Sequence, residues 1–143
     1  MMVKVYDGTN MILGRLATKV AKDALLGEEV RVVNCEKVVV SGRKVNTFDR
    51  EKQRRDRRGH PLKSVKIPRL ADRFVRRTIR GMLPWKQARG KEAFKRIMCY
   101  RGIPEELANE KTINVEGAAT SKLPMLYATT VADIMKNLGG KEQ

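Results

Sequence analysis

The sequence contains few of the residues from which catalytic and metal sites are built. It has one histidine, His60, and two cysteines, Cys35 and Cys99, which lie far apart and outside any CxxC motif. A zinc site needs about four such ligands, so no metal site is predicted. Both cysteines lie in apolar runs, and we expect small buried hydrophobic residues rather than nucleophiles. No acid–base or nucleophilic constellation can be assembled, so we predict no catalytic residue, no cofactor and no small-molecule substrate.

Long hydrophobic runs are also missing. The N-terminus has no apolar segment of the signal-peptide kind, and no stretch approaches the roughly 20 apolar residues of a membrane-spanning helix. The apolar fraction of 41% is ordinary, so disorder throughout is not expected. The 143 residues fit a single domain, 1–143, with one core. We expect a soluble protein of the cytoplasm with no membrane partner.

Acidic residues are scarce in the middle of the chain. Between Arg43 and Arg101 there are 21 lysines and arginines against five acids, a net charge of +16. The remainder carries 10 basic and 11 acidic residues, a net charge of −1. The whole excess of +15 therefore lies in one stretch. Basicity confined in this way is typical of a surface that binds phosphate groups.

The centre of this basic stretch predicts an amphipathic helix with an uninterrupted row of arginines. Arginines recur at i, i+3, i+4 and i+7 and share one helical face: Arg73, Arg76, Arg77 and Arg80. The opposite face is expected to pack into a core and consists of Ala71, Phe74, Val75, Thr78, Ile79 and Met82. Solvated faces normally mix both signs of charge. We interpret the row as a binding surface for a polyanion, since guanidinium groups fit phosphate and stack on exposed bases.

A basic arm at about residues 43–69 precedes this helix. Its segment 49–58 has almost no apolar residue, and alone it would be a poor helix or a mobile loop. Residues 63–69 are expected to be extended, because Pro68 disfavours a helix before it. A disordered linker is the alternative, but such arms commonly become ordered against nucleic acid.

A further basic loop follows the arginine helix at 85–91. Trp85 in this loop could stack on a base or serve as a core or edge contact. The arm, the helix and the region up to residue 96 together give the predicted RNA-binding residues: Arg54, Arg55, Arg57, Arg58, His60, Lys63, Lys66, Arg73, Arg76, Arg77, Arg80, Lys86, Arg89, Lys91, Lys95 and Arg96.

The flanking regions predict an α/β fold. A short strand is expected at 2–6, a helix from Leu13 that Gly27 ends, and two apolar β-branched strands at 30–33 and 38–40. A strand, a helix and a strand within about 33 residues form a βαβ unit with parallel pairing.

The C-terminal half is expected to continue with short elements. These are a helix at 92–97, strands at 98–100 and 112–115, and a final helix capped by Thr130. The final helix carries the apolar stripe Val131, Ile134, Met135 and Leu138, so the tail from about 105 to 143 is expected to serve packing.

The βαβ unit suggests an enzyme acting on nucleotides or RNA as a second hypothesis. Five residues separate Gly8 from Gly14 where a Walker loop needs four, and Arg15-Leu16 stands where that loop needs Lys followed by Ser or Thr. The dinucleotide motif GxGxxG also lacks its middle glycine. A third hypothesis is a DNA-binding or translational-regulatory protein that uses the same basic surface, which composition alone cannot separate from an RNA-binding one.

Three sequence blocks resemble one known family. They are LGRLAT at 13–18, VNCEKVVVSGRK at 33–44 and IRGMLP at 79–84, followed at matching distances by Gly90, Phe94, Tyr100-Arg101-Gly102 and Ile103-Pro104. Over about residues 5–105 the chain resembles the large-subunit ribosomal protein thirteen family in its archaeal and eukaryotic branch. The resemblance implies a three-layer α/β/α fold with a small, mainly parallel sheet and an extended basic arm.

The same resemblance implies binding to large-subunit ribosomal RNA, early assembly into the subunit and contacts with neighbouring large-subunit ribosomal proteins. It supplies no catalytic residue. The leading hypothesis is therefore a structural, rRNA-binding constituent of the large ribosomal subunit that supports subunit assembly and translation.

Overall fold

The computed structural model describes residues 3–57, 59–60, 62–63, 66–125 and 127–140. Its strands and α-helices, in chain order, are β1 Val3–Asp7, α1 Leu13–Leu25, β2 Glu29–Val33, β3 Val39–Ser41, α2 Lys44–Asp56, α3 Ala71–Gly81, α4 Ala88–Lys95, β4 Ile97–Cys99, β5 Thr112–Ile113, β6 Ala128–Thr130 and α5 Val131–Asn137. Short 3₁₀ turns lie at Cys35–Lys37, Glu105–Leu107, Glu116–Ala118 and Thr120–Lys122.

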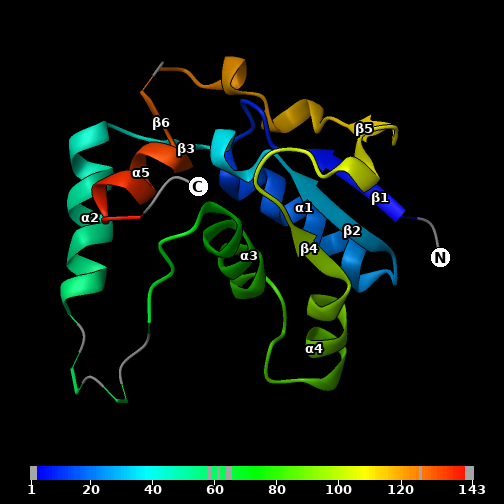
Figure 1. Ribbon diagram of the computed structural model, residues 1–143, viewed down its shortest axis with the longest axis horizontal. Helices are drawn as coiled ribbons and strands as arrows, with labels where there is room; N and C mark the ends of the chain where they lie inside the picture. Colours follow the sequence, from blue (N-terminus) through cyan, green and yellow to red (C-terminus); the bar gives the residue numbers. More distant parts are fainter. Residues whose placement is uncertain (1–2, 58, 61, 64–65, 126, 141–143) are drawn as a thin grey trace.

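A four-stranded parallel sheet in the order β4-β2-β1-β5 forms the centre of the fold. Helix α1 provides the crossover from β1 to β2, as the βαβ pattern predicts, and packs against α3 and α4 (Figure 1). The parallel sheet with its helices confirms the expected α/β/α architecture. No helix among the described residues is long and apolar enough to cross a membrane.

The strand expected at 38–40 does not join this sheet. β3 pairs antiparallel with β6, with Val39 opposite Thr130, in a separate two-stranded sheet. The chain turns away after β2 because Asn34 adopts a left-handed backbone conformation, with φ of 54°, before the turn at Cys35–Lys37. β6 leads directly into α5, where the Thr130 hydroxyl accepts the Asp133 N–H at 3.2 Å. The expected cap of the last helix is thus confirmed.

One continuous hydrophobic core unites the sheet with α1, α3 and α5. Both free cysteines are buried in it, as expected. Met82, from the predicted apolar face of the arginine helix, is instead 41% exposed. It follows the last residue of α3, so no further turn of that helix covers it.

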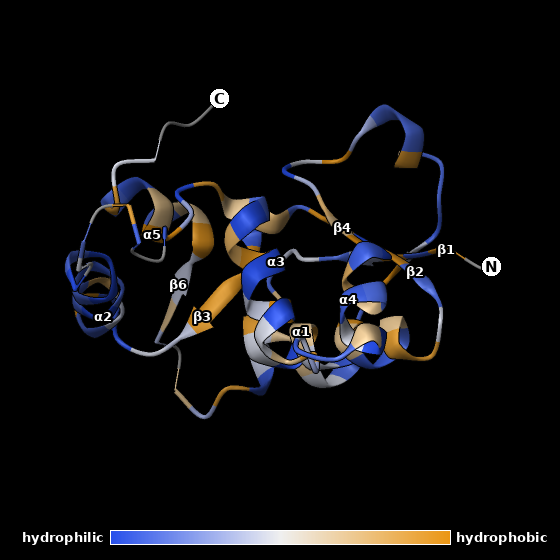
Figure 2. Cartoon of the chain, turned by 90° about the horizontal axis from the view of Figure 1, so that it is seen from below, coloured by the Kyte–Doolittle hydropathy of each residue, from blue (hydrophilic) through white to orange (hydrophobic). Residues whose placement is uncertain are grey.

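The first half of the basic arm is a helix, α2, and not the mobile loop that its composition also allows. Thr47 and Glu51, one turn apart on α2, are both 3% exposed, and Phe48 packs against the core. α2 lies beside α5 (Figure 1), and its ribbon is hydrophilic over nearly its whole length (Figure 2). Tertiary contacts on one narrow face therefore stabilise a helix that the apolar pattern alone does not support. The described residues between α2 and α3 are non-helical.

Candidate nucleic-acid interface

The arginine helix is confirmed as α3. Ala71, Phe74, Val75 and Ile79 are buried on one side, while Arg73 is exposed and the other three arginines of the row are partly exposed. Among the described residues, no ion pair joins any of these four guanidinium groups to a carboxylate. Their charge is available to an external anion.

The four arginines line one groove together with the segment 66–70. The groove has a volume of about 830 Å³, and its lining residues are Lys66, Ile67, Pro68, Arg69, Leu70, Arg73, Arg76, Arg77, Arg80 and Phe94. We call it the arginine groove. None of the described residues in this lining is a carboxylate. The Arg77 guanidinium donates to the Lys66 carbonyl at 2.7 Å, which ties the segment to α3. Arg69 is a groove residue that the sequence reasoning missed, although its place between Pro68 and α3 in a basic run could have indicated it.

Two aromatic rings support two of these arginines. The Arg76 guanidinium carbon lies 4.4 Å from the centre of the Phe94 ring, and that of Arg80 lies 5.2 Å from the centre of the Trp85 ring. Trp85 and Phe94 meet edge to face, with ring centres 5.0 Å apart and an interplanar angle of 88°. Each cation–π contact at such exposure contributes about 0.5–1 kcal/mol.

A close backbone contact fixes the loop that carries Trp85. The Gln87 N–H donates to the Pro84 carbonyl at 2.9 Å, and α4 then passes so near that a Cβ on Gly90 would lie 2.1 Å from the same carbonyl oxygen. Only glycine allows this approach. α4 begins at Ala88, earlier than the expected 92, so most of the predicted basic loop is helical.

The arm residues form a second cavity beside the arginine groove. It has a volume of about 710 Å³, and its charged and polar lining includes Glu51, Arg54, Arg57, His60, Lys63 and Arg77. Arg77 lines both cavities. The buried Glu51 carboxylate accepts from Arg50 and Arg54, at 3.3 Å each, and offsets part of the local charge. Arg58 lies outside the described residues.

Two predicted RNA-binding arginines donate to backbone carbonyl groups near the ends of helices α5 and α1. The Arg55 guanidinium donates to the Leu138 carbonyl just after α5, and that of Arg96 donates to the Ala24 carbonyl near the end of α1 at 3.3 Å. Basic side chains at such positions satisfy carbonyl groups that a helix end leaves free. The exposed cations of the α4 region are Lys86, Arg89, Lys91 and Lys95.

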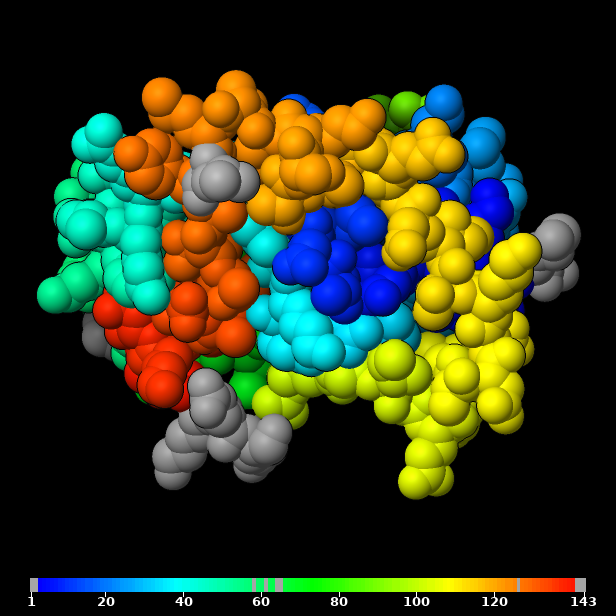
Figure 3. All heavy atoms as spheres, turned by 90° about the horizontal axis from the view of Figure 1, so that it is seen from above, coloured from blue at the N-terminus to red at the C-terminus, as the bar shows by residue number. Residues whose placement is uncertain are grey.

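The position where a nucleotide-binding loop would lie is filled by the protein's own chain. The Ala118 carbonyl accepts the Ile12 N–H at 2.7 Å, just before α1 begins, and the Thr120 hydroxyl donates to the Asn10 carbonyl at 2.6 Å. The Arg15 guanidinium donates to the Gly117 carbonyl at 2.9 Å. Figure 3 shows the C-terminal segment, in yellow and orange, lying across this side of the molecule beside the N-terminal residues in blue. These contacts agree with the failed phosphate-loop motif.

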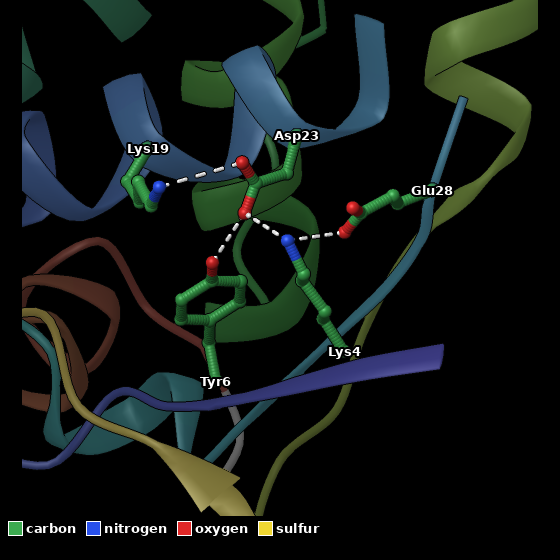
Figure 4. A network of polar contacts seen from close by, with 5 residues as sticks. All are labelled: Lys4, Tyr6, Lys19, Asp23 and Glu28. Carbon is green, nitrogen blue, oxygen red and sulfur yellow. Dashed lines mark hydrogen bonds and ion pairs between the residues drawn. The ribbon is translucent and has the colours of Figure 1, made fainter. Parts of the chain in front are cut away.

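A charge network centred on the buried Asp23 joins β1 to α1 (Figure 4). None of its residues is among those that line the arginine groove. The Asp23 carboxylate, 3% exposed, accepts from the Tyr6 hydroxyl and pairs with Lys4 at 3.4 Å and Lys19 at 3.5 Å. Lys4 also pairs with Glu28. Burial favours a higher pKa for Asp23, but the Tyr6 hydrogen bond and the two lysines outweigh it and leave the pKa below its ordinary value.

The other pKa shifts in this part of the molecule also have structural causes. Burial, and then the hydrogen bond to Asp23, raises the pKa of Tyr6. At the end of β1, burial alone would raise the pKa of Asp7, but hydrogen bonds from Asn34 and Thr9 lower it. These groups stabilise the fold, and none of them is among the residues that line the arginine groove.

Comparison with known proteins identifies the family. Residues 1–106 match the model of the family described as ribosomal protein L13. The large ribosomal subunit protein uL13 of Methanococcoides burtonii is 44% identical over 96% of this chain and 98% of its own length. The uL13 proteins of Archaeoglobus fulgidus and Methanopyrus kandleri are 41% and 44% identical, each over 94% of this chain and 86% of its own length. Neither the family nor these relatives are enzymes by name, and the chain belongs to the ribosomal protein L13 family.

Proposed function

We propose that this protein is a structural constituent of the large ribosomal subunit that binds large-subunit ribosomal RNA as a single domain, 1–143. The observation that carries the proposal is the arginine groove, where four guanidinium groups on one helix face have no carboxylate partner among the described residues. Membership in a ribosomal protein family supports the same reading.

Binding would proceed through the phosphates of the RNA backbone. Guanidinium groups form paired hydrogen bonds with phosphate oxygens, and the counterions released from RNA add to the free energy of binding. The arginine groove supplies the central contacts, and the second cavity, which the arm residues form beside it, extends them on one side. Lys86, Arg89, Lys91 and Lys95 extend them on the other. Arg55 and Arg96 belong to the proposed RNA-binding residues and have a second role, because their guanidinium groups also stabilise helix ends within the protein.

The rest of the molecule positions this surface. The tail from about 105 covers the start of α1 and supplies α5, which packs against α2 and α3. Neighbouring large-subunit proteins are proposed as further partners, and the cytoplasmic ribosome as the location. The role in the subunit is to neutralise and hold RNA during assembly and translation.

Sedimentation of a cell extract tests this function. The protein should migrate with the large subunit, and ribonuclease treatment should release it to the top of the gradient. A protein that sediments alone before ribonuclease treatment would contradict the proposal. Competition between large-subunit rRNA and duplex DNA at fixed salt should favour the rRNA, whereas equal competition would support the DNA-binding alternative.

A further inference from the structure

We propose that the indole of Trp85 receives an unpaired base of the bound RNA by stacking. This inference rests on the proposed rRNA-binding function and adds a nucleobase site to a surface that otherwise offers charge to phosphates. Trp85 is the single tryptophan of the chain and is 39% exposed, although the neighbouring Leu83 is buried. An indole exposed to this degree leaves apolar area that a partner can cover.

The indole is held in place before any partner arrives. Phe94 contacts it edge to face at 5.0 Å, and the Arg80 guanidinium lies 5.2 Å from its centre. Its backbone is also fixed, because the Trp85 N–H donates to the Leu83 carbonyl at 2.7 Å and Gly90 seats α4 against Pro84. A side chain that is already oriented loses little conformational entropy on binding.

The charge around Trp85 selects the kind of partner. Between Arg73 and Arg96 the sequence carries nine cationic residues and one acid, Glu92. Phe94, which contacts Trp85, lines the arginine groove itself. An apolar protein segment would cover the indole but leave these cations without counter-charges. A nucleotide satisfies both requirements, because its base stacks while the adjoining phosphates meet arginine and lysine.

The partner base must be unpaired. Bases inside a duplex are stacked on their neighbours, and a side chain reaches a base face only in loops, bulges and single strands. The proposed site therefore distinguishes two kinds of RNA contact. The arginines of the groove bind backbone phosphates of any RNA, paired or unpaired. Trp85 stacks only on the base of an unpaired nucleotide beside the groove.

The fluorescence of the single tryptophan tests this inference on the unmodified protein. Single-stranded oligouridine should quench the Trp85 emission at saturation, because a stacked base quenches indole. A perfectly paired RNA duplex of equal length should bind without comparable quenching. Binding of both probes is measured separately by filter retention.

Binding of oligouridine with unchanged emission, or equal quenching by the duplex, would overturn the stacking site and leave the rRNA-binding function intact. Absence of binding to any RNA would overturn both.

Two substitutions measure the contribution of the ring. Trp85→Leu should weaken oligouridine binding roughly fivefold to a hundredfold, the range found for stacked bases, while duplex binding changes less than about twofold. Trp85→Phe keeps an aromatic face and should retain most of the affinity. Urea unfolding of each variant confirms that the fold is kept. Equal losses for single strand and duplex in Trp85→Leu would contradict the inference, since they would indicate a general effect on the surface.

Discussion

The Arg76 guanidinium lies over the Phe94 ring at 4.4 Å, and its Nη2 donates to the Phe94 carbonyl at 3.4 Å. Arg76 lines the arginine groove from α3, while Phe94 belongs to α4, so the contact joins a proposed RNA-binding group to a second helix. The arginine is therefore partly oriented without RNA. Its Nε is buried and has no hydrogen-bond partner among the described residues.

Phe94→Leu should weaken RNA binding about two- to fivefold, the equivalent of one cation–π contact. The number of phosphates contacted should not change, so the slope of log affinity against log salt should stay that of the wild type. Arg76→Gln removes a charge and should make that slope shallower by about 0.7 to 0.9. Filter binding over a salt series measures both. A changed slope in Phe94→Leu would show that the ring does more than orient the arginine.

Gly90→Ala should destabilise the fold by about 2 kcal/mol or more, since its Cβ would lie 2.1 Å from the Pro84 carbonyl oxygen and α4 would have to shift. The matched control is Gly14→Ala in α1, where, apart from its chain neighbours and the backbone of its own helix, no atom of the described residues lies within 4 Å of the added Cβ. That change should be neutral or stabilising by up to about 1 kcal/mol. Urea unfolding of both variants gives the comparison. Equal changes in the free energy of unfolding for the two variants would mean that the Pro84 carbonyl leaves room for a Cβ at position 90.

Asp23 should make the stability depend on pH in the acid range. Its folded-state pKa lies below the ordinary value of 3.8, so its contribution is fully present above that pH and is lost as pH falls through the folded-state pKa. Asp23→Asn should destabilise the protein by about 1–3 kcal/mol at neutral pH, because the Tyr6 hydroxyl and the lysines lose a charged partner.

Unfolding free energies measured from neutral pH to below 3.8 test this assignment. The difference between wild type and Asp23→Asn should shrink as the medium becomes more acid. A difference that stays constant would assign the acid sensitivity to other carboxylates, such as Asp7, whose pKa is also lowered.

The sequence predicts elements well where apolar spacing is regular. The four arginines and the buried Phe74, Val75 and Ile79 place α3 correctly, and Gly27, with φ of 100°, ends the first helical region as expected. Prediction from the sequence fails where contacts between distant parts of the chain determine the local conformation. α2 has a helical conformation because Thr47 and Glu51 become buried against other elements, and β3 leaves the main sheet because Asn34 adopts a left-handed conformation.

The partners of the basic residues were the least accessible to sequence reasoning. Arg96 and Ala24 are 72 residues apart in sequence, and no local pattern predicts their hydrogen bond. The same holds for Arg55 and Leu138, which are 83 residues apart. A charge count treats all arginines of the stretch alike, whereas the fold separates those that line the groove from those that stabilise helix ends.

The arginine groove is the centre of the proposed RNA-binding surface, and the most direct test is a comparison of two triple variants. One replaces Arg76, Arg77 and Arg80 by alanine. The control replaces exposed lysines away from the groove, Lys22, Lys111 and Lys122, and removes the same charge. Binding to large-subunit rRNA is measured over a salt series. The groove variant should fold, lose most of its affinity and show a slope shallower by about 2 to 3, while the control stays near wild type. Equal losses in the two variants, or wild-type binding by the groove variant, would contradict the account.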